Sequence, residues 1–253
     1  MMAPSHAATG ALAGVAATAA ASALFGWPAG FADLAASAGI GAGAALLPDL
    51  DHPRSTASRS LDPATALASR AARAASAAVH RATRTPADGP GDGRHRYLLH
   101  TPVVAVAAGT VLGLLATAWL PVLAAVVWFT LALAVQGLGR ALPDGPGRRG
   151  PASRAGALAL AGGATVLLVW GGVSTGPHAG AALALGMLVH DLGDALTRSA
   201  VPLAWPLRVR GRRWAMVGAP RPMRFTTGSR PEYLIRWACL LATPVLGAAH
   251  LAA

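Results

Sequence analysis

The apolar run from Thr101 to Gly139 limits the folds open to this chain more than any other feature. It contains no charged residue. A single helix over its whole length would be about 58 Å long at 1.5 Å per residue, whereas the hydrocarbon core of a bilayer is about 30 Å thick. The run therefore predicts two membrane-spanning helices, with a break near Trp119, Leu120 and Pro121.

Other apolar segments share this composition, and the chain is 54% hydrophobic but only 12% charged. An ordinary soluble domain is about 25% charged. We therefore expect an all-α polytopic membrane protein with about six or seven transmembrane helices, in a single integral-membrane domain over residues 1–253. Besides the pair within 101–139, the expected spans are 7–27, 34–47, 155–173, 179–197 and 233–251.

The 21 basic residues are all arginines, and most of them gather in three segments, 53–94, 136–154 and 198–230. Pairs of expected spans separate these segments, and the short turns within the pairs lack arginine. Because positive charge accumulates in cytoplasmic loops, we expect all three segments and the N-terminus to face the cytoplasm. A seventh span would put the C-terminus outside. The net charge of +11 then reflects loop topology, and we expect no nucleic-acid partner.

Two further features bear on processing and redox chemistry. Residues 1–10 carry no lysine or arginine, whereas a secretory signal peptide begins with a positive segment, so the first apolar segment is expected to be a retained helix. Cys239 is the only cysteine, which excludes an intrachain disulfide and a CxxC metal site.

The basic cytoplasmic insert 53–94 contains one helix expected outside the bilayer. Asp62 and Pro63 suit the N-cap and first helical positions, and the Ala/Arg segment after them continues to about Arg84. A basic helix of this kind lies on anionic headgroups. We therefore expect a basic cytoplasmic surface helix here and an Arg/Trp-rich cytoplasmic loop at 198–230.

Acidic and histidine residues are scarce, at ten and eight in the chain, yet nine of them fall at similar depth on the predicted cytoplasmic face. Carboxylate oxygens and imidazole nitrogens are ligands for zinc, manganese and magnesium. The nine are His6, Asp49, Asp51, His52, His95, His100, His190, Asp191 and Asp194. Their shared location favours a common metal site.

The strongest local signal is the group of ionisable residues near the end of the span 179–197. His190 and Asp194 are four residues apart and share a helix face, which Thr197 continues. Ionisable groups inside a span are costly, and the two carboxylates of Asp191 and Asp194 repel each other unless a cation or proton compensates. A buried polar pair that packs helices together is the alternative.

The remaining groups have plainer interpretations when each is taken alone. The stretch from Asp49 to His52 could be a polar helix exit between prolines, and His95 and His100 could be interfacial histidines. Three histidines are left out of the expected ligand set. They are His80 on the surface helix, His178 on the opposite face, and His250 near the C-terminus.

Several motifs occur in an order found in a known family. They are Ser5-His6, Leu47-Pro48-Asp49-Leu50-Asp51-His52-Pro53, His95-Arg96-Tyr97-Leu98-Leu99-His100-Thr101, Gly186-Met187-Leu188-Val189-His190-Asp191-Leu192-Gly193-Asp194-Ala195-Leu196-Thr197 and Val201-Pro202-Leu203-Ala204-Trp205-Pro206. Together they resemble the YdjM-type family of bacterial inner-membrane proteins, which is described as metal-dependent hydrolases and likened to zinc-dependent phospholipase C.

One motif departs from the family pattern. The middle motif of the family usually reads His-Arg-Gly-x-Thr-His-Ser, and here Tyr97, Leu99 and Thr101 stand at the Gly, Thr and Ser positions. The outer residues His95, Arg96 and His100 are retained, so ligation there stays open. Glu232 matches an acidic position of the family.

We therefore expect a membrane-bound metal-dependent hydrolase of a phosphoester or lipid-linked substrate at the cytoplasmic face of the bacterial inner membrane. Zinc is the first candidate metal, with manganese or magnesium as alternatives. The expected ligands are His6, Asp49, Asp51, His52, His95, His100, His190 and Asp194. Asp191 is expected to serve as general base or as a partner of a ligand, Arg96 and Arg198 to hold an anionic substrate, and Glu232 to join the catalytic set.

Two alternatives from other classes stay open. A metal or proton transporter would also use intramembrane Asp and His residues, and a non-catalytic membrane scaffold could keep the fold without a complete site. The bilayer is the one partner that every interpretation shares, and the sequence leaves the oligomeric state open.

Overall fold

The structure is a computed structural model that describes residues 1–142, 153–171, 173 and 176–253. Helices and turns make up the described chain, and its only β-bridges are isolated ones near the C-terminal third, which confirms the all-α prediction. The predicted loop 136–154 lies largely outside the described residues, as do Ser174 and Thr175 of the predicted turn between the spans 155–173 and 179–197.

The predicted helices are present with shifted ends. The long ones are α1 (Ala3–Phe25), α2 (Phe31–Ala44), α4 (Ala64–Thr83), α5 (Pro102–Ala118), α6 (Leu120–Gly139), α7 (Arg154–Trp170), α8 (Gly176–Ala195) and α9 (Arg230–Ala252), and the short ones are η1 (Pro48–Asp51), α3 (Thr56–Arg59), η2 (Leu98–His100) and η4 (Arg221–Met223). The break predicted in the long apolar run is confirmed, because Trp119 ends α5 and caps α6.

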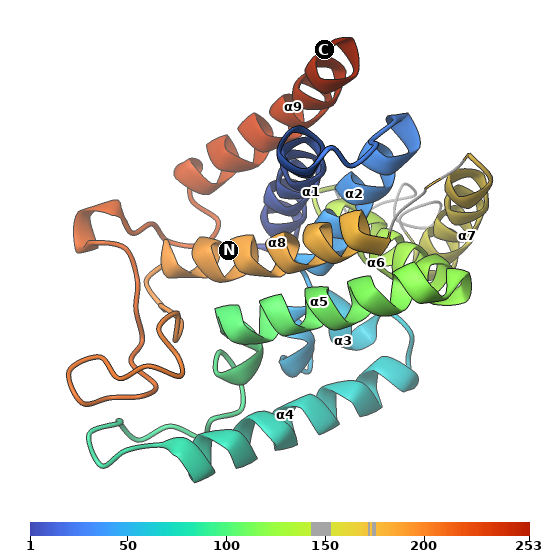
Figure 1. The fold of residues 1–253 in the computed structure, drawn as a ribbon. Helices are drawn as coiled ribbons and strands as arrows, with labels where there is room; N and C mark the ends of the chain where they lie inside the picture. The colour runs from blue at the N-terminus through green and yellow to red at the C-terminus, as the bar shows by residue number, and fades with distance from the viewer. Residues whose placement is uncertain (143–152, 172, 174–175) are drawn as a thin grey trace.

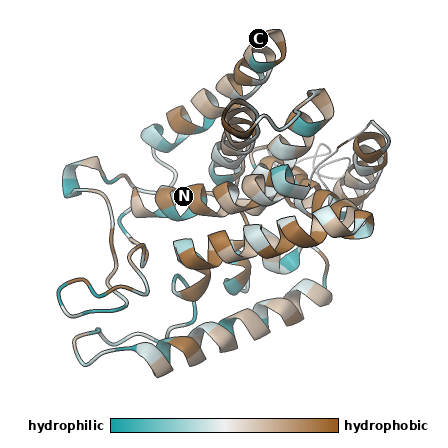
Figure 2. Cartoon of the chain, in the orientation of Figure 1, coloured by the Kyte–Doolittle hydropathy of each residue, from teal (hydrophilic) through white to brown (hydrophobic). Residues whose placement is uncertain are grey.

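Within the described residues, four helical segments are long and apolar enough to cross a membrane. They are Ala3–Phe25, Phe31–Asp51, Leu120–Gly139 and Arg230–Ala252. The helices α5 and α7 are apolar but shorter. Figure 2 shows hydrophobic residues along α5 and hydrophilic ones in the turns of the 198–230 segment. The total of six or seven spans stays a prediction beyond these four.

The helix bundle has two chemically different ends. At one end, which we call the turn end, His178 at the start of α8 bonds the carbonyl of Pro28 after α1, and Gly176 packs on Thr117 at the end of α5. The described part of the turns there, at 26–30 and 119, contains no arginine. The opposite end, which we call the arginine end, gathers the start of α1, the end of α2 and the end of α8.

Helix α2 approaches both α1 and α8 closely enough for their backbones to touch. A Cβ atom on Gly41 of α2 would lie 2.2 Å from the carbonyl oxygen of Gly10 in α1, and one on Gly186 of α8 would lie 2.5 Å from the carbonyl oxygen of Gly41. Gly14 approaches Ser37 in the same way. Small residues permit this close packing inside membranes, and here they bring the polar ends of three helices together.

The surface helix differs from its prediction at its start and on its inner face. Helix α4 begins at Ala64 with Pro63 as its cap residue, because the Asp62 carboxylate accepts a hydrogen bond from Arg154 at 3.1 Å instead of capping the helix. His80 lies on this helix, as expected, and the structure adds that its side chain faces inward. Its side chain is 2% exposed, since it packs against Tyr97 and Trp214 at ring distances of 4.6 and 5.4 Å.

The 198–230 segment is ordered without being helical over most of its length. Val201 and Val217 form an antiparallel bridge, and the backbone of Ala219 donates to the carbonyl of Ala195 at the end of α8. Figure 1 shows this segment beside the C-terminal end of α4, away from α7. It therefore forms one wall of the arginine end.

The backbone contact at Gly41 predicts that two matched glycine-to-alanine substitutions change the stability of the protein in opposite directions. Gly41→Ala forces backbone apart and should destabilise the protein by about 1–3 kcal/mol, which lowers the melting temperature by several degrees. Gly247→Ala in α9 meets nothing within 4 Å and should raise stability by up to about 1 kcal/mol through helix propensity. Thermal unfolding of both variants in detergent checks this; equal melting temperatures would contradict the packing described.

Candidate metal centre

Seven Asp and His side chains meet at the arginine end in two adjacent groups. The first group is Asp49, Asp51, His95 and His100, and the second group is His6, His190 and Asp194. Within each group, one potential ligand atom from every residue lies within 4.8 Å of the others. Seven of the eight ligands predicted from the sequence are therefore brought together from α1, η1, η2, α8 and the turn before η2.

The first group is built around the buried carboxylate of Asp51. The Nδ1 atom of His95 lies 2.6 Å from Asp51 Oδ1, and Nδ1 of His100 lies 3.6 Å from Asp51 Oδ2. On its other side, Nε2 of His100 lies 3.6 Å from Asp49 Oδ1. Asp51 and His100 are fully buried, whereas Asp49 is 28% exposed, so the group opens toward solvent on one side.

The second group is built around Asp194 on the last turn of α8. Its Oδ1 atom lies 3.4 Å from Nε2 of His6, and its Oδ2 atom lies 3.7 Å from Nε2 of His190. The predicted shared face of His190 and Asp194 is thus observed. The rings of His6 and His190 stack at a centroid distance of 3.8 Å, and all three side chains are buried.

The two groups are continuous. Nε2 of His100 lies 3.9 Å from Asp194 Oδ2, and Nε2 of His190 lies 3.9 Å from Asp49 Oδ1. Separations of 3.4–3.9 Å are too long for hydrogen bonds. They are near the roughly 3.3 Å between neighbouring ligand atoms on a tetrahedral zinc ion with bonds of about 2.0–2.1 Å. The spacing therefore fits donors that share cations rather than bond one another.

Buried polar atoms without partners concentrate here. Such atoms are costly, and most buried polar groups in proteins are hydrogen-bonded. Among the described residues, the site atoms without a hydrogen-bond partner are His6 Nδ1 and Nε2, Asp51 Oδ2, His100 Nδ1 and Nε2, His190 Nε2, both oxygens of Asp191, and Asp194 Oδ2. Imidazole nitrogens and carboxylate oxygens gathered in this way could hold a divalent metal ion.

His190 is held in the form that binds a metal. Its Nδ1 atom lies 2.7 Å from the carbonyl oxygen of Ala45, just after α2. Since a carbonyl accepts only, Nδ1 carries the proton and Nε2 presents its lone pair toward Asp49 and Asp194. Sequence reasoning missed Ala45, because a backbone acceptor leaves no side-chain signal.

The electrostatics of the first group favour positive charge. Burial alone would lower the pKa of His100, but the neighbouring carboxylates of Asp49 and Asp51 outweigh it and raise that pKa to about 10. Carboxylates that stabilise a proton on an imidazole this strongly also stabilise a metal cation at the same place.

His52 is the one predicted ligand that the structure leaves outside both groups. It is partly exposed, its ring centroid lies 4.9 Å from that of His95, and its Nδ1 accepts the backbone N–H of Arg54 at 3.3 Å. Burial is the main cause that lowers the pKa of His52, and its electrostatic interaction with His95 acts in the same direction. His52 therefore borders the first group without joining it.

The predicted catalytic residues have distinct surroundings. Asp191 is fully buried and lies three residues before Asp194 in α8. Arg96 contacts Asp194 Oδ2 through Nη2 at 3.2 Å, while its Nη1 is buried and has no hydrogen-bond partner in the described part of the chain. The backbone of Arg96 has a φ of 62°, which is uncommon for a non-glycine residue. Arg198 is exposed.

Glu232 lies outside both groups and connects the start of the chain to the end of the 198–230 segment through hydrogen bonds. Its carboxylate accepts the backbone N–H of Met2 and, at 2.7 Å, that of Gly228. The preceding residue Met1 places its amino nitrogen 2.7 Å from Asp194 Oδ1. Glu232 thus positions the start of α1, from which His6 reaches the second group; Met1 was not singled out from the sequence.

Comparison with known proteins identifies a family for this chain. The sequence model of the family described as "YdjM inner membrane protein" matches residues 1–142, from α1 through α6, which includes His6 and the whole first group. The second group's His190 and Asp194 lie beyond the matched range. No curated protein and no solved structure matches the chain. Because the family match covers more than half of its length, this membrane protein belongs to the YdjM inner membrane protein family.

Proposed function

We propose that the protein is a membrane-bound, metal-dependent hydrolase that acts on a phosphoester at the cytoplasmic face of the inner membrane. The observation that carries this proposal is the convergence of seven Asp and His residues with unpartnered buried donor atoms at one end of the bundle. The resemblance of the motifs to a family described as metal-dependent hydrolases supports the reaction class.

Two adjacent groups suit two cations. The first group combines two carboxylates with two imidazoles, and the second combines two imidazoles with one carboxylate. These sets suit zinc, with manganese or magnesium as alternatives. When bound, zinc would lower the pKa of a coordinated water to about 7, and any of these ions would polarise a phosphoryl oxygen.

The protein's own residues would supply orientation and proton transfer. The carbonyl of Ala45 fixes the tautomer of His190. Asp191 is buried with two free carboxylate oxygens, which suits it to accept a proton from the attacking water. The free Nη1 of Arg96 would donate to a substrate oxyanion, while its Nη2 stays on Asp194.

The position of the groups favours an enzyme over a transporter. A transporter would hold its ionisable residues near the bilayer midplane. Here they come from the first turns of α1, the last turn of α8 and the turns that follow α2 and precede α5. All of these lie at the arginine end, which the positive-inside rule assigns to the cytoplasm.

The altered middle motif does not separate its histidines from the other ligands. Thr101 serves as the cap of α5 by accepting the N–H of Val104, and its hydroxyl donates to Leu98. His95 and His100 both reach Asp51. This favours a complete site over a scaffold that has lost it.

Metal content tests the site through two histidines of the same helix. His190→Ala should reduce bound metal by at least one equivalent per chain, whereas His178→Ala should leave it unchanged. Both side chains are buried in α8 and both bond a backbone carbonyl, but His178 lies at the turn end. Elemental analysis of the purified variants measures this, and equal metal contents would rule out the second group as a ligand set.

A substitution at Asp191 distinguishes a role in hydrolysis from a role in metal binding. Asp191→Asn should retain the metal and lower the rate of hydrolysis of a nitrophenyl phosphodiester by at least about 100-fold, because a positioned base contributes 10²–10⁴. A chelator should abolish the wild-type activity, and the same metal should restore it. If the wild type binds metal, hydrolyses no phosphoester and moves the metal into proteoliposomes, the transporter reading replaces the enzyme.

Orientation is tested by single cysteines in a Cys239→Ser background. Ala82→Cys lies on the exposed face of α4 and should be protected from an impermeant maleimide in intact cells, whereas Ala29→Cys at the turn end should react. Both should react after permeabilisation, which is the control. Labelling of Ala82→Cys in intact cells would place the metal centre on the outer face and contradict the proposal.

A further inference from the structure

We infer that a second, arginine-lined pocket beside the metal centre binds the phosphoryl headgroup of an anionic membrane lipid. This inference names the class of substrate for the proposed hydrolase, and in that respect the inference rests on the proposed function. The pocket itself is argued from residues that take no part in the metal groups.

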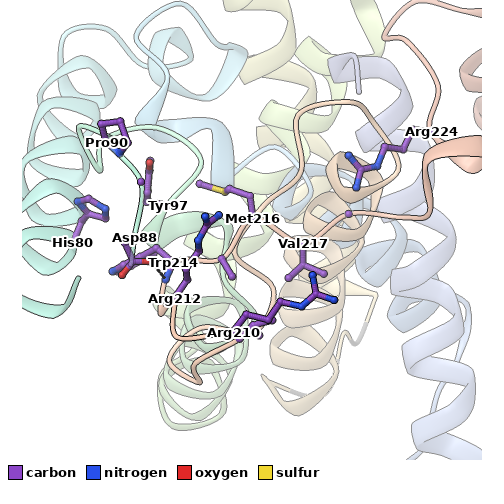
Figure 3. A pocket seen from close by; sticks show the side chains of 14 residues that line it. His80, Asp88, Pro90, Tyr97, Arg210, Arg212, Trp214, Met216, Val217 and Arg224 are labelled. Carbon is purple, nitrogen blue, oxygen red and sulfur yellow. Dashed lines mark hydrogen bonds between the residues drawn. The ribbon is translucent and has the colours of Figure 1, made fainter. Parts of the chain in front are cut away.

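The pocket lies between α4 with its following loop and the 198–230 segment, and its volume is about 820 Å³. Its lining includes His80, Tyr97, Arg210, Arg212, Trp214 and Arg224, which Figure 3 shows around a common space. A space of this size is much larger than a phosphate ion. It therefore suits a phosphoryl group that carries an organic part.

Asp88 holds the two walls of the pocket together. Its carboxylate accepts the backbone N–H of Thr85 on its own wall, and those of Arg213 and Trp214 on the opposite wall. The hydroxyl of Thr85 also donates to the carbonyl of Gly211 across the gap. Burial raises the pKa of Asp88, but these N–H donors outweigh it and lower that pKa, so the carboxylate is ionised and the connection is permanent at neutral pH.

The arginines of the pocket lack acidic partners. Within the part of the chain that the structure describes, no carboxylate oxygen lies within 4 Å of Arg210, Arg212 or Arg224, and the one acidic lining residue, Asp88, is engaged by backbone N–H groups. Arg224 donates through Nε to the carbonyl of Ala219, which leaves its terminal nitrogens for a ligand. Three guanidinium groups around one space are the donors that phosphoryl oxygens prefer.

The aromatic residues argue against a single-stranded nucleic acid as the ligand. Trp214 and His80 are buried, at 4% and 2% exposed, and Trp214 packs against Tyr97 and stacks on Trp205. Single-stranded nucleic acids need free aromatic faces on which bases stack. The rings here support the arginines instead.

The surroundings of the pocket point to a lipid source. Leu207 and Met223, close in sequence to Arg210 and Arg224, are 71% and 63% exposed, and Met216 in the lining is 43% exposed. Apolar side chains that alternate with arginines suit the boundary between headgroups and acyl chains, where the first enter the bilayer and the second meet phosphates.

The pocket and the metal centre share a short piece of chain. Tyr97 lines the pocket, the preceding residue Arg96 contacts Asp194, and His95 contacts Asp51. The residue that lines the pocket is therefore one position from Arg96, which contacts the second group, and two from His95, which contacts the first.

Binding of short-chain phosphatidic acid to the full-length protein in detergent tests the inference by calorimetry. Arg210→Gln/Arg212→Gln should weaken binding at least tenfold more than Arg208→Gln/Arg221→Gln, which removes the same charge from exposed arginines outside the lining. Asp88→Ala raises the net charge by one but releases the two walls, so it should also weaken binding. Equal losses in both double variants, or tighter binding by Asp88→Ala, would overturn the pocket in favour of general charge attraction.

Further measurements identify the ligand and serve as controls. Short-chain phosphatidylcholine should bind more weakly than phosphatidic acid, and glycerol 3-phosphate should bind at least tenfold more weakly than the lipid; equal affinity for glycerol 3-phosphate would overturn the lipid source. His190→Ala should lose metal and keep lipid binding, which separates failure of the hydrolase proposal from failure of this one. Unchanged thermal unfolding of the arginine variants confirms that they are folded.

Discussion

The direct backbone contact of α1, α2 and α8 is the constraint on which the site depends. Gly41 meets both Gly10 and Gly186, so three helices approach more closely than side chains would allow. Each of these helices ends or begins with ionisable residues, and their approach forces His6, the η1 carboxylates and the His190 face into one buried volume. Close packing by small residues and the charge chemistry are therefore two parts of one arrangement.

That arrangement brings together Asp and His side chains that mostly do not hydrogen-bond one another. The His and Asp atoms of the two groups lie mostly beyond hydrogen-bond distance, yet they are shut away from water. A protein keeps such groups buried only when something compensates their charge. The arginine end supplies part of this compensation through Arg96, and cations held by the two groups, as proposed above, would supply the rest.

Local signals in the sequence predicted most of the helices and much of the site. The break at Trp119 follows from bilayer thickness, and the shared face of His190 and Asp194 follows from helix periodicity. His80 could not be predicted, because α4 buries Ser69, Ser76 and Ala77, a face without a hydrophobic pattern. Its partner Trp214 comes from a segment whose position depends on Asp88. The place of His52 outside both groups likewise depends on how the chain turns after η1, which no periodicity encodes.

The hydrogen bond from His190 to the carbonyl of Ala45 has a consequence for how the site responds to strain. Ala45 ends α2, so the direction of the imidazole is set by the register between α2 and α8. Sliding one helix along the other would move this acceptor relative to the imidazole and so change the direction of the ring. The orientation of His190 as a metal ligand therefore depends on the register between α2 and α8. Metal binding would then change in variants that distort the bundle slightly, even where their thermal unfolding is unchanged.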